Sequence, residues 1–395
     1  MSANPAPNQM ILLSLASKQI WPQVLAVAHL KPERLFLLHS EDAAESKGPA
    51  QRLKRLFDDC GLVPKGATRL EQIPDADFDG IERRFDDLQR VHQLPLADCV
   101  VNFTGGNKLM ATAAFRWAAR HARAFYLERR NQLTWFAAPD GKMITRTEQL
   151  DGHCTDDLDP VALLRCQLDA SEIERTGQTL TLSDAGRAIG EAEFSRRIQS
   201  GEDGRRWLTI AGEADRKSNE GDPLEFATAA VLLRLGVKRV QRSLRLKVKS
   251  SPNTGTRKPH AEIDLIFTWA GRLWLVDCKD RKPVEDLADH LRRELPRLLP
   301  NADQLLVRIR NELSIGQTKA LKEDLLAIRE SGGLLGNVVC VRRAELPEEV
   351  LQYANYNGIA VVPKSELLNA LRNLLFPNRP ADPTDLAGLA AHFKT

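Results

Sequence analysis

Short apolar runs alternate with helical patterns along the first third of the chain. The apolar runs are rich in Val, Leu, Ile and Phe and are bounded by turn residues, which predicts buried strands at 10–17, 34–40, 98–106 and 123–127. Apolar positions at helical spacing predict helices between them, around 19–30, 49–60, 78–92 and 107–120. This order predicts an α/β domain over residues 1–138, with an open parallel sheet covered by helices on both faces.

The pattern changes after residue 138. Turn sequences such as PDG at 139–141 and GEDG at 201–204 interrupt segments that show little sustained apolar period. We expect residues 139–220 to be a connecting region, with one small helical element near 183–199.

A well-marked helix opens the third part, 221–395. Asp222 is a candidate N-cap, Pro223 occupies the first helical position and Gly236 follows the last turn. One face of this helix is apolar through Leu224, Ala227, Val231, Leu232 and Leu235. Further along, the pattern predicts strands at 239–249, 261–269, 272–279 and 336–342, and helices at 284–299 and 364–375.

Composition narrows the class of protein. Hydrophobic residues make up 43% and charged residues 28% of the 395, which is typical of a folded chain with two or three domains. No apolar run approaches the roughly 18 residues of a membrane span, and the start has no signal-peptide pattern, so we expect a cytoplasmic location. The six cysteines form no CxxC pair, which argues against a zinc ribbon or a disulfide framework. A net charge of +3 does not by itself indicate a nucleic-acid partner.

Two predicted strands, 261–269 and 272–279, bring acids and a lysine together. If Ala270 and Gly271 form a two-residue turn, Trp269 pairs with Arg272, and Asp264 then lies directly opposite Asp277. Opposed side chains have Cβ atoms about 4.5 to 5.5 Å apart, so two carboxylates there repel each other unless a cation lies between them.

A divalent metal is the simplest such cation. Mg²⁺ or Mn²⁺ prefers oxygen ligands, which Asp264, Asp277 and the backbone carbonyl of Cys278 could provide. Lys279 would then orient a water or stabilise charge on a scissile phosphate. The alternative is a set of solvated charges at strand ends, but the apolar flanks on both strands indicate a buried sheet.

Two glutamates near this group have more than one interpretation. Glu225 is a candidate catalytic acid, but it also stands at N3 relative to Asp222, where a capping box explains it structurally. Glu262 faces Lys279 in the same register and is either a ligand or only a partner of that lysine.

The helix with Glu225, followed by Asp264 and by Asp277-Cys278-Lys279, resembles the PD-(D/E)XK restriction-endonuclease superfamily. The resemblance spans roughly 221–345, with the elements in the right order. It implies a restriction-endonuclease-like C-terminal domain that cuts nucleic acid with a metal ion. The chain departs from the pattern at Asp277, where the family often has glutamate, and this bears on metal preference.

A basic segment precedes the acids. Arg245, Lys247 and Lys249 alternate with apolar residues, so one face of the strand is cationic and suited to a phosphate backbone. The alternative is a charged edge strand protected against aggregation.

The segment VVNFTGGNKLM places a Gly-rich loop between a buried strand and a helix. Its residues are Thr104, Gly105, Gly106, Asn107 and Lys108. Helix N-termini attract anions, and in open α/β sheets ligands bind beyond the carboxyl ends of strands. Ser14, Ser17 and Lys18, after the first strand, should therefore line the same crevice. A plain strand-to-helix turn would also use glycine, and the loop matches neither the dinucleotide fingerprint nor a Walker loop.

The TGGNKLM loop resembles the TGG-T-K-x-M type loop of CARF domains, with Asn107 in place of the common threonine. CARF domains are Rossmann-like sensors of cyclic oligoadenylates in type III CRISPR defence. With a restriction-type nuclease behind it, the whole chain resembles the Card and Can family of CRISPR ancillary nucleases. That resemblance implies cyclic tetra-adenylate as the activator and a homodimer, in which a ring of equal units lies on the twofold axis.

Three functions remain at this point. The first is a ligand-gated endonuclease acting on RNA, single-stranded DNA or nicked duplex DNA. The second is a ligand-sensing regulator whose nuclease-like domain only binds nucleic acid. The third is a nucleotide-dependent metabolic enzyme. The intact set Asp264, Asp277 and Lys279 favours the first over the second, and the missing dinucleotide fingerprint counts against the third.

Overall fold

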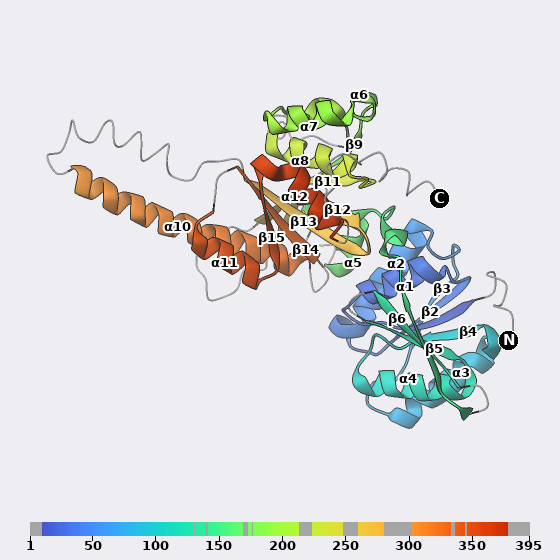
Figure 1. The fold of residues 1–395 in the computed structure, drawn as a ribbon. Helices are drawn as coiled ribbons and strands as arrows, with labels where there is room; N and C mark the ends of the chain where they lie inside the picture. Colours follow the sequence, from blue (N-terminus) through green and yellow to red (C-terminus); the bar gives the residue numbers. More distant parts are fainter. Residues whose placement is uncertain are drawn as a thin grey trace. The chain divides into compact units, whose positions relative to one another are not determined.

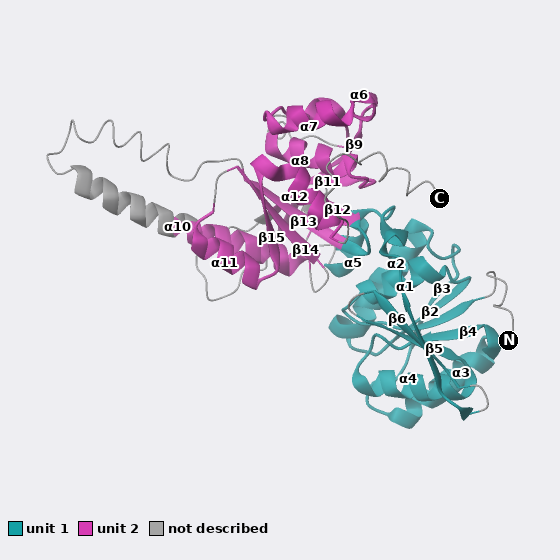
Figure 2. Cartoon of the chain, viewed as in Figure 1, with its two compact units in different colours: residues 1–169, 269–272 teal, residues 170–268, 273–395 magenta. Residues whose placement is uncertain are grey.

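The chain divides into two compact units, which are coloured separately in Figure 2. Unit 1 comprises Met1–Asp169 and Trp269–Arg272, and unit 2 comprises Ala170–Thr268 and Leu273–Thr395. The computed structural model describes residues 10–128, 131–138, 141–168, 173–175, 177–212, 223–247, 260–279, 302–332, 336–343 and 346–377.

In its described residues, unit 1 contains a seven-stranded sheet of order β3-β2-β1-β4-β5-β6-β7. The strands are β1 (Ile11–Leu15), β2 (Arg34–His39), β3 (Thr68–Gln72), β4 (Cys99–Asn102), β5 (Arg123–Leu127), β6 (Gln132–Ala137) and β7 (Ile144–Gln149). Strands β1 to β5 pair in parallel, whereas β6 and β7 extend the sheet with antiparallel pairs. The central strands are buried apolar runs, as a sheet covered on both faces requires.

Helices cover both faces of this sheet (Figure 1). They are α1 (Trp21–Leu30), α2 (Gly48–Cys60), α3 (Phe78–Val91), α4 (Lys108–His121) and α5 (Pro160–Gln167), with short turns η1 (Ala43–Lys47), η2 (Leu96–Asp98) and η4 (Gly152–Thr155). Helices α3 and α4 pack on the face that carries Leu13 and Val101, where Phe85 and Trp117 have ring centroids 5.1 Å apart. The order reverses between β1 and β4, so their carboxyl ends flank the crevice where such sheets bind ligands.

Unit 2 contains, among its described residues, an eight-stranded sheet of order β10-β9-β11-β12-β13-β14-β15, with β8 also paired to β11. Its strands are β8 (Ile173–Arg175), β9 (Gln178–Leu182), β10 (Leu208–Ala211), β11 (Val240–Lys247), β12 (His260–Trp269), β13 (Arg272–Lys279), β14 (Gly336–Arg342) and β15 (Ile359–Pro363). Strands β11 and β12 are antiparallel, and β13, β14 and β15 are parallel. The α/β class expected from the sequence is therefore confirmed in both units.

The helices of unit 2 are α6 (Asp184–Ala188), α7 (Glu191–Gln199), α8 (Pro223–Arg234), α10 (Ala302–Ser331), α11 (Glu348–Tyr356) and α12 (Leu367–Leu375), with turns η6 (Gly204–Trp207) and η10 (Lys364–Glu366). Helix α8 begins at Pro223 as expected and is buried almost all round, beginning with Leu224 and Phe226. The helix expected at 284–299 and the candidate N-cap Asp222 lie outside the described residues.

Residues 139–220, expected to be a connecting region, contain ordered elements of both units. Strand β7 and helix α5 belong to unit 1, and β8 to β10 belong to the unit 2 sheet. The helical element expected near 183–199 is present as α6 and α7. Strand β7 is largely exposed and has little apolar alternation, and β8, β9 and β10 have only 3, 5 and 4 residues, so their sequences carry a weak strand signal.

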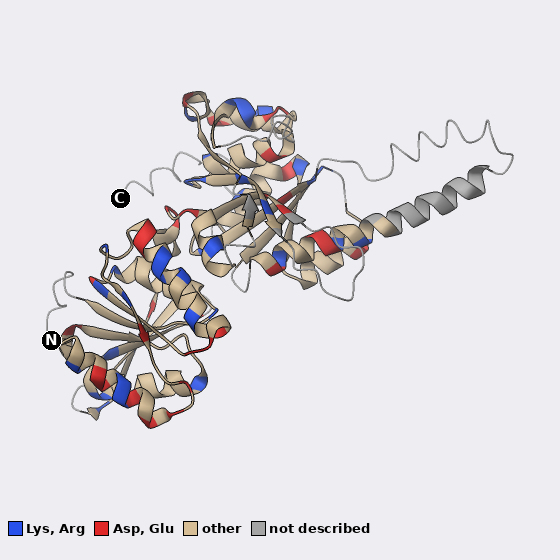
Figure 3. Cartoon of the chain, turned by 180° about the vertical axis from the view of Figure 1, so that it is seen from behind, with Lys and Arg blue, Asp and Glu red and all other residues tan. Residues whose placement is uncertain are grey.

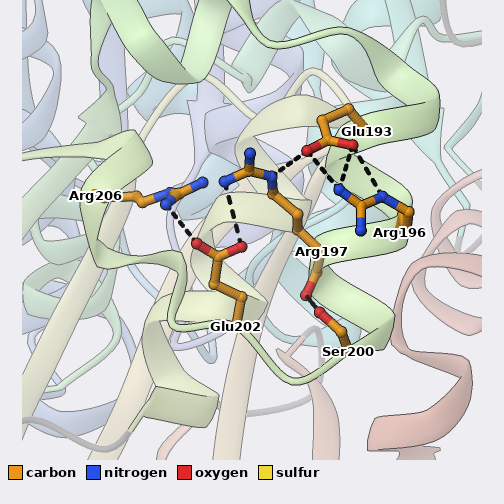
Figure 4. A network of polar contacts seen from close by, with 6 residues as sticks. All are labelled: Glu193, Arg196, Arg197, Ser200, Glu202 and Arg206. Atoms are coloured by element: carbon orange, nitrogen blue, oxygen red, sulfur yellow. Dashed lines mark hydrogen bonds and ion pairs between the residues drawn. The ribbon is translucent and has the colours of Figure 1, made fainter.

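Charged residues of both signs occur along the helices of each unit, as the blue and red stretches of the ribbon in Figure 3 show. One exposed network joins α7 and η6, where Arg197 pairs with both Glu193 and Glu202, and Arg206 pairs with Glu202 at 2.5 Å (Figure 4). Solvent screens pairs at the surface and they contribute little to stability, so the network is a surface feature. None of the six cysteines, all of which lie in the described ranges, forms a disulfide. Within the described residues, no helix combines the length and the apolar character that crossing a membrane needs.

Candidate functional site

The Gly-rich loop of unit 1 lies against the end of β1. Asn102, the last residue of β4, donates a hydrogen bond of 3.1 Å from Nδ2 to Oγ of Ser14. A side chain at Gly105 would collide with the carbonyl oxygen of Leu15, and Gly106 has φ of +74°. Glycine is therefore required at both positions, and the structure brings Ser14 and the Gly-rich loop together as the sequence predicted.

In unit 2, the turn between β12 and β13 places the two aspartates. Ala270 and Gly271 have φ of +49° and +73°, as a two-residue hairpin turn requires, and this turn sets Asp264 across from Asp277. Oδ2 of Asp264 accepts a hydrogen bond of 2.6 Å from the backbone N–H of Cys278. Both carboxylates are buried, Asp277 completely and Asp264 with 7% of its surface exposed.

Two cations contact Asp277. Nζ of Lys279 lies 2.8 Å from Oδ1, and Nη2 of Arg342, on the neighbouring strand β14, donates a hydrogen bond of 3.0 Å to Oδ2. Oδ1 is buried, and the ammonium of Lys279 is its partner. Arg342 was not identified from the sequence, because nothing local connects it with an aspartate 65 residues earlier.

Glu225 lies close enough for its charge to act on Asp264, but it already has a strong partner. Nε of Arg242 donates a hydrogen bond of 2.6 Å to Oε2 of Glu225, and the two side chains are 3% and 13% exposed. The same guanidinium donates to Oε1 of Gln178 at 3.2 Å and lies over the ring of Phe226, 4.4 Å from its centroid. Arg242 is a second residue of this site that the sequence analysis missed.

Burial and charge set the protonation of the cluster. Burial raises the pKa of Asp264 well above its ordinary value, and the charges of Asp277 and Glu225 raise it further. Burial alone would lower the pKa of Lys279, but the charges of Asp277 and Asp264 outweigh it and raise this pKa. Burial also raises the pKa of the Cys278 thiol, so this side chain stays neutral. Lys279 is therefore held in its charged form.

The donor set fits a hard divalent cation. Among the described residues, no group of three or more His, Cys, Asp or Glu side chains is arranged to hold a metal. The cluster offers the carboxylates of Asp264 and Asp277, and Oδ1 of Asp277 is a buried oxygen that faces the ammonium of Lys279. Oxygen donors of this kind suit Mg²⁺ or Mn²⁺, which keep several waters and need few protein ligands.

The basic strand is only partly described. Arg245 is half-buried and pairs across the sheet with Glu262, whose side chain is exposed. The side chain of Lys247 and the whole of Lys249 lie outside the described residues. Strand β11 pairs with β12 on one side and with β8 and β9 on the other, so it is an interior strand and not an edge strand.

Residues 11–150 match the family model of the Card1 CARF domain. This part of the chain is a CARF domain of the Card1 type. The match covers the Gly-rich loop, the β1 crevice and strands β1 to β7 of unit 1. The comparison with curated proteins found no match.

Solved structures share the fold over nearly the whole chain. Can2 from Sulfobacillus thermosulfidooxidans, in complex with cyclic tetra-adenylate, aligns at a TM-score of 0.53 and 14% identity, covering 92% of this chain and 96% of that one. Protein VC1899 from Vibrio cholerae aligns at 0.53 and 14% identity, covering 93% and 98%. A type III CRISPR defence DNA nuclease activated by cyclic oligoadenylate aligns at 0.49 and 18% identity, covering 97% and 54%. At these identities the likeness concerns the fold.

In the CARF domain, two polar residues of the Gly-rich loop are committed to the fold. Asn107 caps α4 by accepting a hydrogen bond of 2.8 Å from the backbone N–H of Met110, and its Nδ2 donates to the carbonyl of Asp75 at 2.9 Å. Oγ1 of Thr104 accepts from the backbone N–H of Leu127 at 2.8 Å. These contacts fix the loop, so its conformation exists before any ligand binds.

The lysines of the CARF crevice are exposed. Lys108 opens α4 at the positive end of the helix, and Lys18 pairs with Glu45 at 2.9 Å in an exposed ion pair. Ser17 is half-buried. Exposed cations beside a rigid loop can contact an anionic ligand without breaking buried interactions.

Proposed function

We propose that this protein is a metal-dependent endonuclease whose activity is switched on by a cyclic oligoadenylate, with cyclic tetra-adenylate as the activator, in type III CRISPR defence. The CARF domain supports the sensor part, and so does the shared fold with Can2, whose structure contains cyclic tetra-adenylate. The observation that carries the nuclease part is the buried carboxylate of Asp277, whose Oδ1 lies 2.8 Å from the ammonium of Lys279, on the same hairpin as Asp264.

The activator binds in the crevice at the ends of β1 and β4. Backbone N–H groups of the Gly-rich loop and the start of α4 donate hydrogen bonds to phosphate, while Lys108 and Lys18 supply positive charge. A ring of four equal units has twofold symmetry, so two copies of the crevice in a homodimer bind it together. Activation then reflects tighter binding of the ring to the active arrangement of the dimer.

Cleavage uses the acid and lysine cluster of unit 2. Asp264 and Asp277 hold Mn²⁺ or Mg²⁺ with the backbone carbonyl of Cys278, and when bound the cation supplies Lewis-acid chemistry at the phosphate and at a water. Lys279 stabilises the charge that builds on the scissile phosphate. Because the charges of Asp277 and Asp264 raise its pKa, Lys279 acts as a cation and not as a proton acceptor. Arg245, Lys247 and Lys249 contact the phosphate backbone of the substrate.

A second candidate is a regulator whose nuclease-like unit binds nucleic acid without cutting it. The contacts of Arg342 and Lys279 with Asp277 favour it, because two cations already neutralise part of the acid cluster. Both candidates need the activator, and they differ only in cleavage.

One assay separates the two candidates. Labelled RNA, single-stranded DNA and supercoiled plasmid are each incubated with Mn²⁺ or Mg²⁺, with and without cyclic tetra-adenylate. We expect cleavage of at least one substrate only when metal and activator are both present, and none by the Asp277→Asn protein. Binding without cleavage under every condition would support the regulator.

A further inference from the structure

Arg342 is held by two contacts on the same face of the unit 2 sheet as Asp277. In the parallel pairing of β13 and β14, Asp277 stands beside Cys340 and Lys279 beside Arg342. Since alternate residues of a strand share a face, these four side chains lie on one side of the sheet. Nε of Arg342 contacts Sγ of Cys340 at 2.9 Å while Nη2 donates to Oδ2 of Asp277 at 3.0 Å. The guanidinium is 9% exposed, so both contacts are shielded from water.

The two carboxylate oxygens of Asp277 have different partners. Oδ2 accepts a hydrogen bond from Arg342, whereas Oδ1 pairs with the ammonium of Lys279, which lies 2.8 Å away. A carboxylate fixed in this way offers one oxygen to a cation. Mg²⁺ and Mn²⁺ suit single-oxygen carboxylate ligands, whereas Ca²⁺ tolerates bidentate carboxylates and irregular coordination.

We propose that Arg342 is a positioning residue of the metal site, which holds Oδ2 of Asp277 so that only Oδ1 is offered and small six-coordinate cations are preferred over Ca²⁺. The inference rests on the proposed metal-dependent nuclease function. It concerns which ion the site selects, which is separate from whether the protein cuts nucleic acid.

A role of Arg342 as a counter-charge and a role in positioning Asp277 predict opposite changes in Mn²⁺ affinity when Arg342 is replaced. If Arg342 were only a counter-charge for a buried acid, its loss would leave the site more negative and Mn²⁺ would bind more tightly. If it positions Asp277, its loss lets the carboxylate rotate, and Mn²⁺ binds less tightly. Lysine at this position keeps the charge but lacks the planar fork that contacts Cys340 and Asp277 together, so it tests position alone.

The test is calorimetric titration of the full chain with MnCl₂ and with CaCl₂, in the absence of nucleic acid. We expect Arg342→Lys and Arg342→Met each to weaken Mn²⁺ binding by about tenfold or more, as the loss of a partner that orients a metal ligand does. Ca²⁺ binding should weaken less, so the preference for Mn²⁺ over Ca²⁺ narrows. Arg343, the next residue and an exposed one, provides the matched controls Arg343→Lys and Arg343→Met, which should leave both affinities unchanged.

The results that would contradict the proposal concern either the role of Arg342 or the metal site itself. Tighter Mn²⁺ binding by Arg342→Met, or an unchanged Mn²⁺ to Ca²⁺ ratio in Arg342→Lys, would overturn the positioning role. If circular dichroism shows that Arg342→Met does not fold, Arg342→Lys decides the question alone. Asp277→Asn separates a failure of the metal site from a failure of the role of Arg342. If Asp277→Asn binds Mn²⁺ as tightly as the parent protein, or if the parent protein binds no Mn²⁺, the proposed metal site is wrong. If Asp277→Asn loses binding and the Arg342 variants do not, only the role of Arg342 fails.

Discussion

The backbone N–H of Cys278 donates a hydrogen bond of 2.6 Å to Oδ2 of Asp264, across the two strands of one hairpin. The bond ties the carboxylate of Asp264 to the residue between Asp277 and Lys279. The hairpin therefore fixes the acids and the lysine relative to one another, which is what a site for a metal and a phosphate requires.

Glu225 and Arg242 form a buried ion pair. Replacing one of the two residues should destabilise unit 2 more than replacing both. Glu225→Gln removes the carboxylate charge that pairs with Arg242, whose side chain is 3% exposed, so we expect the free energy of unfolding to fall by roughly 3 kcal/mol. Chemical denaturation followed by circular dichroism measures this change.

The double variant Glu225→Met with Arg242→Met should recover most of that loss, because two apolar side chains can replace a buried ion pair. Glu262→Gln, at an exposed position of the same sheet, is the control and should change stability little. A Glu225→Gln protein as stable as the parent would show that the pair is not what holds Arg242 in place.

Lys108 should contribute to activator binding and not to the fold. Because it is exposed at the start of α4, Lys108→Ala removes a charge-assisted contact with phosphate, and affinity for cyclic tetra-adenylate should fall about tenfold or more. Calorimetry measures the affinity, and Lys65→Ala, an exposed position in the loop before β3, serves as the control. Equal affinity of Lys108→Ala and the parent would place the ligand site elsewhere.

Several helices and strands could be predicted from the sequence, because an element with one buried face has apolar residues at regular spacing. The ends of α2, α3 and β13 lie within about two residues of those expected, since apolar residues on one face define them. Strand β7 was not foreseen, because its sequence ITRTEQ is largely exposed and shows no apolar alternation. Helix α10 was also missed, since its sequence has only a weak apolar stripe.

Some residues of the candidate site could be predicted from local sequence spacing, and others could not. Asp264, Asp277 and Lys279 could be placed on one face from strand alternation and a turn count. Arg242 and Arg342 could not, because each reaches its carboxylate from another element, and no local spacing encodes contacts that are 17 and 65 residues apart.

Glu82 should make the stability of the CARF domain depend on pH. Hydrogen bonds from Arg116, at 2.6 and 2.5 Å, lower the pKa of Glu82 below its ordinary value of 4.5, with help from the charge of Arg120. A lowered carboxyl pKa stabilises the fold above the unfolded-state pKa, and this stabilisation is lost as pH falls through the folded-state pKa.

We therefore expect the parent protein to be more stable than Glu82→Gln near pH 7. This difference in unfolding free energy should be largest there and should shrink as pH falls below 4.5. Denaturation at a series of pH values measures it, with Glu33→Gln, at an exposed position of unit 1, controlling for the loss of one negative charge. A difference that stays constant down to pH 3, or grows there, would contradict the assignment.

The rate of cleavage by Lys279→Ala, measured with activator and Mn²⁺ both saturating, tests the central claim most directly. The substitution removes the cation that we propose stabilises the scissile phosphate, while Arg245 and the rest of the basic strand, the proposed substrate contacts, remain. We predict a loss of at least about a hundredfold in rate, as when one transition-state donor is deleted, with substrate affinity nearly unchanged. A Lys279→Ala protein that cuts as fast as the parent would contradict the account, because the cleavage would then arise outside the cluster of Asp264, Asp277 and Lys279.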